Sequence, residues 1–206
     1  MAQLERLWWS LVRFGFRLLY NEFAFTYDGV SWVVSLGNWR CWQRTALKHI
    51  STPEAGIVLD LAHGTGNLHL DLHAADYRTV GCDLSPHMGR ITASKFANNG
   101  QHASLVRGYG QSLPFDDEAF SSIVCTFPTP FIFEAETVAE CHRVLQPGGK
   151  LTIVLSGMLT GGVGAGLIEW LYRITGQHSN EPINTSVLVG FLEAGFGSDL
   201  VNEDCP

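Results

Sequence analysis

Residues 58–66 read Val-Leu-Asp-Leu-Ala-His-Gly-Thr-Gly, an apolar run followed by a loop of small residues. The spacing of apolar residues after Gly66 predicts that a helix begins directly behind this loop. Small side chains at positions 62, 64 and 66 let the backbone approach a ligand closely, and free N–H groups at a helix N-terminus favour a carboxylate or a phosphate. We therefore expect a ligand site at this strand-to-helix turn.

The chain on both sides of this turn alternates between strand and helix patterns. Apolar runs predict strands at 57–61, 79–84, 103–107, 120–127 and 150–156. Helical spacing predicts helices at 67–75, 86–98, 134–145 and 185–194, and a Gly-rich loop at 161–166 before another helix at 167–175. Such alternation is typical of an α/β fold with a doubly wound, mostly parallel sheet. In such sheets, ligands bind outside the carboxyl ends of the strands.

The first 50 residues differ from the rest of the chain in charge. They carry six basic and three acidic side chains, whereas residues 51–206 carry seven and seventeen. Residues 4–25 have the spacing of an amphipathic helix with a basic stripe of Arg6, Arg13 and Arg17, which argues against a membrane span and a secretory signal. The helix either packs on the protein's own core or attaches to an anionic membrane surface. We expect residues 1–50 to form a helical cap and residues 51–206 to form the ligand-binding domain.

Composition limits the class of protein. The chain has 206 residues, of which 46% are hydrophobic, and its formal net charge of −7 argues against nucleic-acid binding. Its cysteines are scattered, odd in number and without a C-x-x-C pair: Cys41, Cys82, Cys125, Cys141 and Cys205. We expect them to be buried thiols in a cytoplasmic protein, peripheral to a membrane at most, with no disulfide and no metal site.

Asp83 ends the second predicted strand, 23 positions after Asp60. A carboxylate at this place can accept hydrogen bonds from both hydroxyls of a ribose. The glycine fingerprint of dinucleotide-binding proteins is incomplete because His69 stands at its third position, and no Walker lysine is present. These residues favour a nucleoside ligand without a pyrophosphate. A nicotinamide-dependent oxidoreductase is therefore disfavoured, although it stays the alternative enzyme.

Four ordered motifs resemble those of the class I S-adenosylmethionine-dependent methyltransferases, over about residues 24–200. They are residues 58–66, Gly-Cys-Asp-Leu-Ser-Pro-His-Met at 81–88, residues 107–115 followed by Asp116, Asp117 and Phe120, and Arg-Val-Leu-Gln-Pro-Gly-Gly-Lys-Leu at 143–151. Within that superfamily, Tyr27-Asp28 and Ser-Leu-Gly-Asn-Trp-Arg-Cys-Trp-Gln-Arg at 35–44 resemble the ubiquinone/menaquinone C-methyltransferase group. The resemblance implies methyl transfer from S-adenosylmethionine to a small acceptor, with S-adenosylhomocysteine as the second product.

The resemblance also implies which residues contact the cofactor. They are Tyr27, Asp60, Ala62, Gly64, Gly66, Asp83, Leu84, Tyr109, Gly110, Gln111, Thr126 and Phe127. In this assignment the loop meets the methionine moiety, Asp83 binds the ribose hydroxyls and Leu84 packs on the adenine. Three positions depart from the family's pattern: Ala62 replaces its first glycine, His63 a small residue or cysteine, and Tyr109 an aspartate that binds adenine.

The loop after the fourth strand is the expected acceptor wall. It is apolar, is stiffened by two prolines and leaves the sheet where ligands bind. Its expected acceptor contacts are Pro128, Thr129 and Phe131. With the aromatic N-terminal segment as a lid, this pocket favours an apolar or aromatic acceptor, either quinol- or phenol-like or a lipid headgroup.

The candidate general bases are His63, in the first loop, His178, His142 and Asp28; His142 is favoured least because it lies inside the predicted helix at 134–145. A base is needed less when the acceptor is a phenolate or a neutral amine than when it is carbon or a neutral hydroxyl. Outside the enzymes, a non-catalytic cofactor-binding or membrane-associated module stays an alternative. Members of the resembled family commonly continue into two antiparallel edge strands, so the resemblance implies that the last edge strand is lacking. Either the domain is trimmed, or a partner subunit in a homodimer covers the exposed sheet edge.

Overall fold

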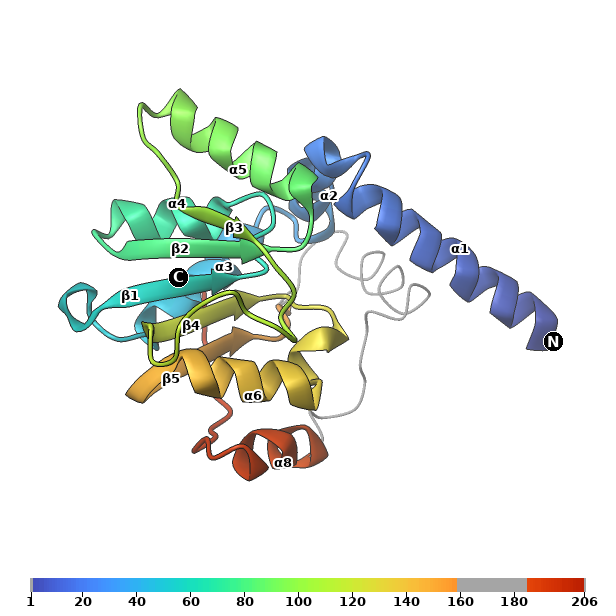
Figure 1. Cartoon of the computed structure of the whole chain (residues 1–206). Helices are drawn as coiled ribbons and strands as arrows, with labels where there is room; N and C mark the ends of the chain where they lie inside the picture. Colours follow the sequence, from blue (N-terminus) through green and yellow to red (C-terminus); the bar gives the residue numbers. More distant parts are fainter. Residues whose placement is uncertain (1, 159–184, 206) are drawn as a thin grey trace.

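A computed structural model describes residues 2–158 and 185–205. Its centre is one sheet of five parallel strands in the order β3-β2-β1-β4-β5 (Figure 1). The strands are β1 (Ile57–Leu61), β2 (Arg78–Asp83), β3 (Leu105–Arg107), β4 (Phe120–Thr126) and β5 (Leu145–Val154). This confirms the predicted α/β fold with a parallel sheet. The predicted loop at 161–166 and helix at 167–175 lie outside the described residues.

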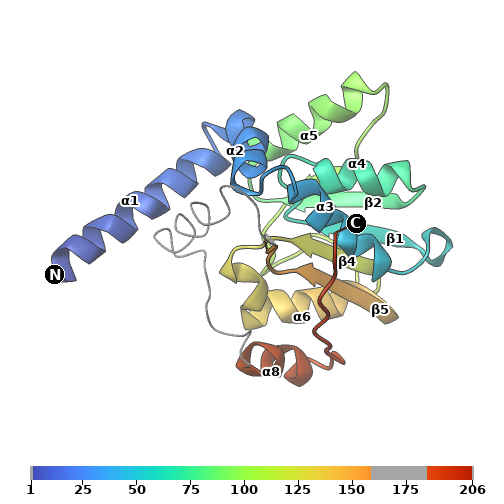
Figure 2. The same cartoon turned by 180° about the vertical axis from the view of Figure 1, so that it is seen from behind.

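Helices cover both faces of the sheet (Figures 1 and 2). They are α4 (Asn67–Ala74), α5 (Pro86–Asn98), α6 (Ala135–Val144) and α8 (Thr185–Glu193). Within the described chain, α4 lies on one face and α6 on the opposite face. The start of α5 follows from local chemistry: Ser85 Oγ accepts a hydrogen bond from the N–H of Met88 at 3.3 Å, and Pro86 occupies the first turn.

The core lies around β1 and β4, the two central strands. Four of the five residues of β1 and the first six of β4 are buried. Two buried serines of β4 are paired with backbone: Ser122 Oγ accepts the N–H of Ser51 at 2.9 Å, and Ser121 Oγ donates to the carbonyl of Ile57 at 3.2 Å. Buried polar groups are tolerated where they are hydrogen-bonded, so these two serines can lie in the buried centre of the sheet.

β5 starts at Leu145, five residues before the predicted start at residue 150. Leu145 already pairs with Phe120, and Lys150 pairs with Ser122, so residues 146–149 bulge out opposite one residue of β4. Pro147 has no N–H to donate to the ladder, and Gly148 has a left-handed φ of +76°. These two residues interrupt the strand locally without ending it.

The N-terminal segment forms several helices. They are α1 (Ala2–Tyr20), the 3₁₀ turn η1 (Ala24–Thr26), α2 (Tyr27–Val34), α3 (Trp39–Arg44) and the turns η2 (Thr45–Lys48) and η3 (Pro53–Ala55). The predicted helix at 4–25 therefore ends five residues early. α1 extends away from the sheet (Figure 1). In the described part of the chain, no helix is both long enough and apolar enough to cross a bilayer.

Ion pairs anchor α3 beside the sheet. Arg40 and Arg44 of α3 both reach Asp71 of α4, at 2.7 Å and 2.8 Å from its Oδ1. Burial raises the pKa of Asp71, but the hydrogen bonds from the two guanidinium groups outweigh it and hold the pKa below its ordinary value. Because both arginines are largely solvent-exposed, these pairs fix the position of α3 more than they add stability.

The prediction of five unpaired cysteines was wrong. Cys41 of α3 and Cys205 near the C-terminus form a disulfide, although 164 residues separate them in sequence. Cys82, Cys125 and Cys141 are buried free thiols, as predicted. The segment after α8 runs back across the sheet to α3 (Figure 2), where Glu203 also bonds Lys48 and His49 at 2.6 Å and 2.8 Å. The tertiary fold, not sequence spacing, brings the two half-cystines together.

Candidate functional site

The loop after β1 has an unusual backbone. Ala62, Gly64 and Gly66 have left-handed φ values of +57°, +55° and +77°. A Cβ on Gly66 would lie 2.4 Å from Thr92 Cγ2, whereas a Cβ on Gly64 would meet no atom within 4 Å. Gly66 is thus required by packing on α5, and Gly64 leaves open space beside the loop. Ala62 carries a steric cost of about 1–2 kcal/mol in this conformation.

Asp83 connects this loop to the start of α5. Its Oδ2 accepts the N–H of Gly64 at 2.9 Å, and its Oδ1 accepts the N–H of Ser85 at 2.7 Å. The side chain is partly exposed. Each carboxylate oxygen has further acceptor capacity, so two more donors, such as vicinal hydroxyls, can bind the same carboxylate. The backbone bonds hold its orientation for that purpose.

Three polar side chains lie beneath the loop. His63 is buried, with Nδ1 2.9 Å from the carbonyl oxygen of Gly64 and 3.2 Å from Thr92 Oγ1. Asp60 is also buried, and its Oδ2 lies 3.2 Å from Nδ1 of buried His69. Both histidines are packed inside the fold. His63 therefore shapes the turn, and the geometry does not favour it as a base; the cofactor contact of Asp60 stays a prediction.

The first turn of α2 packs on the same loop. Asp28 Oδ1 accepts hydrogen bonds from Thr65 Oγ1 at 2.5 Å and Asn67 Nδ2 at 2.9 Å, and its Oδ2 accepts one from Lys95 Nζ at 2.6 Å. Burial raises the pKa of Asp28, but these bonds, that of Lys95 foremost, outweigh it and hold the pKa below the ordinary 3.8. Asp28 therefore ties α2, the loop and α5 together as a carboxylate.

Tyr27, the first residue of α2, is close enough to Asp83 for that carboxylate to act on its pKa. Its ring is 5.7 Å from that of Tyr20 and 6.3 Å from that of Trp39, centroid to centroid. Burial, then the neighbouring Tyr20, Asp28 and Asp83, raises the pKa of Tyr27 far above its ordinary value. Tyr27 is therefore a neutral phenol, and its contact with the cofactor stays a prediction.

An aromatic wall stands at the carboxyl end of β4. Phe127 has a left-handed φ of +49°, and its ring centroid lies 4.1 Å from that of Trp39 and 6.2 Å from that of Trp42. A bulky residue in this conformation is a backbone outlier, of the kind that clusters at functional sites. We call Tyr27, Trp39, Trp42 and Phe127 the aromatic wall. Its tryptophans come from α3, so sequence reasoning on β4 alone could not include them.

Gln43 of α3 is a polar residue that the sequence analysis missed. Its Nε2 donates to Thr126 Oγ1 at 3.0 Å, which places it at the end of β4 under the aromatic wall. The side chain is buried, and its Oε1 has no hydrogen-bond partner among the described residues. An unpaired buried acceptor costs about 1–3 kcal/mol, so it is a natural partner for a ligand donor. The signal for it was a glutamine inside an otherwise aromatic and basic helix.

The predicted adenine contacts follow β2 and β3 in the chain. Leu84 and Tyr109 are both exposed, and the backbone of Leu84 is held by a bond from Arg107 Nε at 3.0 Å. A Cβ on buried Gly110 would lie 2.8 Å from the ring of Phe131, so only glycine fits there. The side chain of Gln111 is already hydrogen-bonded, because its Nε2 donates to Glu134 at 2.6 Å.

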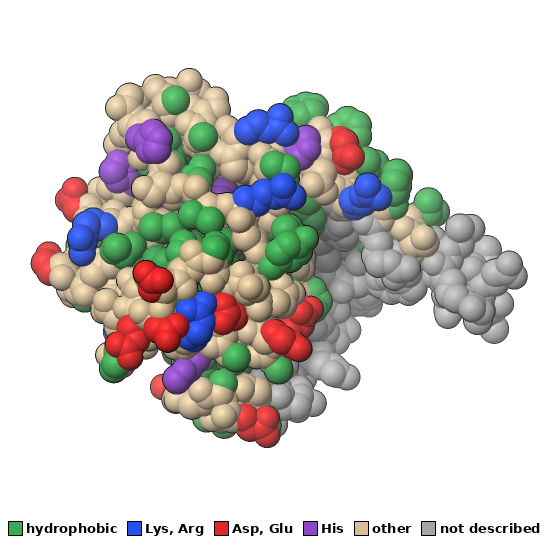
Figure 3. Space-filling view, viewed as in Figure 1, with side chains coloured by type: hydrophobic (Ala, Val, Ile, Leu, Met, Phe, Trp, Pro, Cys, Tyr) green, Lys and Arg blue, Asp and Glu red, His purple; other side chains and the backbone are tan. Residues whose placement is uncertain are grey.

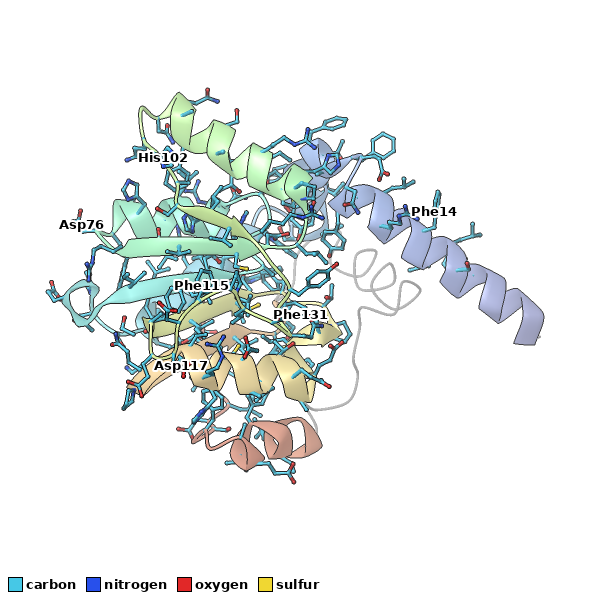
Figure 4. The ribbon with its side chains drawn as sticks, viewed as in Figure 1. Phe14, Asp76, His102, Phe115, Asp117 and Phe131 are labelled. Carbon is cyan, nitrogen blue, oxygen red and sulfur yellow. A yellow bond between two sulfur atoms is a disulfide. The ribbon has the colours of Figure 1, made fainter. Side chains whose placement is uncertain are left out.

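The predicted acceptor contacts divide into two groups. Pro128 and Thr129 lie in the loop beyond Phe127, partly buried and exposed respectively. Phe131 belongs to the turn η4 (Pro130–Phe133) and packs against the core and Gly110 (Figure 4). Phe131 thus stabilises the fold of the loop after β4. His178, the second candidate base, lies outside the described residues.

A groove in the described part of the chain lies apart from the first loop. It has a volume of about 1520 Å³ and runs along β5 and the C-terminal segment 195–205. It shares Trp42 with the aromatic wall, but none of the polar residues around the first loop lines it. We therefore place the candidate site by convergence of loop, carboxylate and aromatic wall at the strand ends, as expected for an open α/β sheet.

This arrangement narrows the class of protein. A parallel α/β sheet, a glycine loop after β1 and a carboxylate at the end of β2 are typical of α/β proteins that bind a nucleoside, the S-adenosylmethionine-dependent methyltransferases among them. The chain belongs to the ubiE/COQ5 methyltransferase family, whose family model matches residues 16–163. The predicted resemblance is thereby confirmed.

Curated relatives agree with this assignment. The chain is 33% identical over 145 residues to the ubiquinone/menaquinone biosynthesis C-methyltransferase UbiE of Geobacter sp. (strain M21), covering 67% of this chain and 61% of that protein. It is 32% identical over 148 residues to the demethylmenaquinone methyltransferase of Chlorobaculum tepidum, covering 69% and 60%. The chain thus spans about three fifths of the length of these two relatives.

Solved structures share the fold. A candidate S-adenosyl-L-methionine-dependent methyltransferase of Methanococcus maripaludis is similar with a TM-score of 0.66 and 21% identity, covering 88% of each chain. A candidate methyltransferase of Bacillus halodurans gives a TM-score of 0.58 at 22% identity, covering 75% of this chain and 68% of that one. At these identities the likeness extends to the fold alone.

Proposed function

We propose that this chain transfers a methyl group from S-adenosylmethionine to a small aromatic acceptor of the quinol or phenol type. The observation that carries the proposal is the aromatic wall beside the loop after β1, with Trp39 and Phe127 rings 4.1 Å apart. Such rings form a rigid apolar surface that suits a planar acceptor. The names of the Geobacter and Chlorobaculum relatives refer to quinone biosynthesis and to demethylmenaquinone, which supports the same acceptor class.

The residues around the loop fit the cofactor. Gly64 leaves open space beside it, Asp83 keeps acceptor capacity for ribose hydroxyls, and Leu84 and Tyr109 offer exposed apolar surface to an adenine. When bound, the cofactor supplies a methyl group on a positively charged sulfur, an electrophile that needs alignment more than activation. The part left to the protein is to bind, orient and exclude water.

The chain's own residues can perform these tasks. The aromatic wall excludes water, and the faces of Trp39 and Phe127 favour a positive charge nearby. Gln43 Oε1 is a buried acceptor for a ligand N–H or O–H. Among the described residues of the site, Asp28 is held by Lys95, and His63 is packed under the loop. We therefore propose an acceptor that ionises without a dedicated base, as a phenol or quinol does, in preference to a neutral alcohol.

Calorimetric titration with S-adenosylhomocysteine, with NADH as the control, tests the cofactor. Micromolar binding of S-adenosylhomocysteine alone is the expected result, and binding of NADH instead would favour the oxidoreductase. The acceptor is then tested by S-adenosylhomocysteine release with hydroquinones, phenols and lipid amines. Turnover confined to the lipid amines would overturn the quinol assignment, and binding without any turnover would favour a non-catalytic module.

A further inference from the structure

The disulfide joins the C-terminal segment to the helix that carries the tryptophans of the aromatic wall. Cys41 lies within α3, between Trp39 and Trp42, and Cys205 belongs to a stretch, residues 196–205, that forms neither helix nor strand. α3 has six residues, and a helix that short is not stable on its own. Its position, and with it one side of the aromatic wall, therefore depends on what tethers it.

Apart from the disulfide, residues 199–205, which we call the tail, have few bonds to the rest of the described chain. Glu203 bonds Lys48 and His49 at 2.6 Å and 2.8 Å, and the side chain of Lys48 is 53% exposed. Ion pairs in such positions contribute little, because water competes for both partners. Val201 is 60% exposed. The covalent bond is thus the main tether of the tail.

Charge does not hold the tail on the body either. The tail carries Asp199, Glu203 and Asp204 and no basic side chain. Residues 51–206 as a whole carry seventeen acidic and seven basic side chains, and Figure 3 shows acidic ones gathered around α6. Like charges repel, so a tail that is freed from α3 has little to draw it back except the two bonds of Glu203.

Solvent reaches the two residues of the disulfide but not the other cysteines. Cys41 and Cys205 are partly exposed, whereas Cys82, Cys125 and Cys141 are buried. Thiol–disulfide exchange requires a thiolate that can reach one of the two sulfurs. Burial raises the pKa of the Cys82 and Cys141 thiols to about 12, so neither supplies a thiolate inside the fold. An attack on the disulfide must therefore come from outside the chain.

Trp42 connects the disulfide to the candidate site. It follows Cys41 in α3, and its ring centroid lies 6.2 Å from that of Phe127 in the aromatic wall. A Cβ on Gly157 would lie 2.1 Å from the Trp42 ring, so the backbone after β5 packs directly against this ring. Trp42 and Cys205 line the same groove. Removal of the tail would therefore open the groove beside Trp42.

We propose that the Cys41–Cys205 disulfide is a reversible redox switch that sets the rigidity of the aromatic wall. A thiolate of an external dithiol attacks one sulfur and forms a mixed disulfide with it, and the other cysteine leaves as a thiolate. The second thiolate of the dithiol then displaces the first cysteine. Two electrons and two protons have passed from the dithiol to Cys41 and Cys205, and the dithiol has become a disulfide. The tail is then free, and α3 keeps its noncovalent contacts alone.

Amide hydrogen exchange of the full chain, followed by mass spectrometry over seconds to minutes, tests the switch. Residues 39–45 should exchange about tenfold faster after reduction with dithiothreitol, because α3 opens locally once its covalent link is broken. β1 and β4 should stay protected over the same minutes, since core strands exchange only on global unfolding. Oxidation with glutathione disulfide should restore the protection of α3.

Two variants serve as controls. Cys205→Ser should exchange as the reduced parent protein does, with or without dithiothreitol. Glu203→Gln weakens the noncovalent bonds of the tail and keeps the disulfide. While oxidised, it should be protected as the parent protein is, which separates the covalent tether from the ion pairs.

Four results would overturn the proposal. Residues 39–45 exchange equally in both redox states, or oxidation fails to restore their protection. β1 and β4 lose protection as fast as α3 on reduction, which would mean that the disulfide stabilises the whole fold. The folded protein, treated with dithiothreitol and freed of it, still titrates with three thiols, which would mean that the disulfide is closed to exchange.

The effect of the switch on methyl transfer rests on the proposed function, but its effect on α3 does not. Reduction should raise the KM of the acceptor about tenfold and change the affinity for S-adenosylhomocysteine by less than about threefold, because no described residue of the tail bonds the loop after β1. If S-adenosylhomocysteine does not bind the oxidised protein, the cofactor assignment fails. The hydrogen-exchange result still decides the switch in that case.

Discussion

Replacement of Asp83 by alanine should affect stability and ligand binding by separable amounts. The substitution removes two hydrogen bonds to a carboxylate, from the N–H groups of Gly64 at 2.9 Å and Ser85 at 2.7 Å. Hydrogen bonds to charged groups contribute about 1.5–3 kcal/mol each, and partial exposure of the side chain reduces this. We expect a loss of about 2 kcal/mol in the free energy of unfolding, and a fall in Tm of roughly 4–8 °C for a chain of this size.

Ligand binding should fall for a different reason. If Asp83 accepts bonds from the ribose hydroxyls, its loss should weaken S-adenosylhomocysteine binding by about 100-fold, which equals about 2.7 kcal/mol. A distorted loop would also weaken binding, so the assay compares S-adenosylhomocysteine with its 2′,3′-dideoxyribose analogue by calorimetry. The parent protein should discriminate between them by about 100-fold, and Asp83→Ala by no more than about threefold.

The control for this cycle is Asp116→Ala, an exposed carboxylate in another loop. It should keep the parent discrimination and stability. If Asp83→Ala still discriminates between the two ligands as the parent does, the carboxylate does not touch the ribose, and its role is confined to the loop. That result would refute the assignment even where the affinity of the variant is low.

Three further predictions concern the cap and the tail. Asp28 has a pKa below its ordinary 3.8, so its stabilising effect is complete above that value and is lost as the pH falls through the lowered pKa. Asp28→Asn, which leaves Lys95 without a carboxylate, should cost about 1 kcal/mol in the free energy of unfolding by urea at pH 7. The loss of stability of this variant in acid should be smaller than that of the parent protein. Cys41→Ser should lower the urea midpoint, by about 2–4 kcal/mol in the free energy of unfolding, and reductant should affect the parent alone. Gln43→Leu should change stability by less than about 1 kcal/mol, because the amide already has one unpaired atom, yet weaken the binding of S-adenosylhomocysteine or of the acceptor by about tenfold in calorimetry.

Each of these has a contrary result. If the free energy of unfolding falls in acid as steeply in Asp28→Asn as in the parent protein, the lowered pKa of Asp28 does not contribute to stability. Five free thiols titrated in the denatured, unreduced protein would contradict the disulfide, since three are expected. Full affinity for both ligands in Gln43→Leu would leave its buried oxygen without a function.

Local chemistry made much of the fold predictable. β1 was predicted at the residues where it occurs because an apolar run is bounded by Gly56 and the small-residue loop. The start of α5 followed from Ser85 and Pro86. β5 was predicted too late because Pro147 and Gly148 ordinarily end an element, whereas here they occupy a bulge within it. Short-range signals located the elements but could not tell an interruption from a boundary.

The candidate site was predictable in part for the same reason. Asp83 and the glycines of the first loop are contiguous with strands, and their patterns can be read along the chain. Gln43 and the tryptophans of α3 reach β4 only through tertiary packing, over 83 residues in the case of the Gln43–Thr126 bond. The same limit hid the disulfide of Cys41 and Cys205, because no local pattern encodes a pair so far apart.

The link between Cys41 and Cys205 also has a consequence in time. During synthesis α3 emerges long before its disulfide partner, and at roughly 5–20 residues per second the intervening chain takes on the order of 10–30 s to appear. Within that interval, α3 gains its two arginine contacts once Asp71 has emerged, and the packing of its tryptophans once Phe127 has. One side of the site is thus laid down early by reversible contacts, and its covalent link forms only after the strands of the sheet have been synthesised.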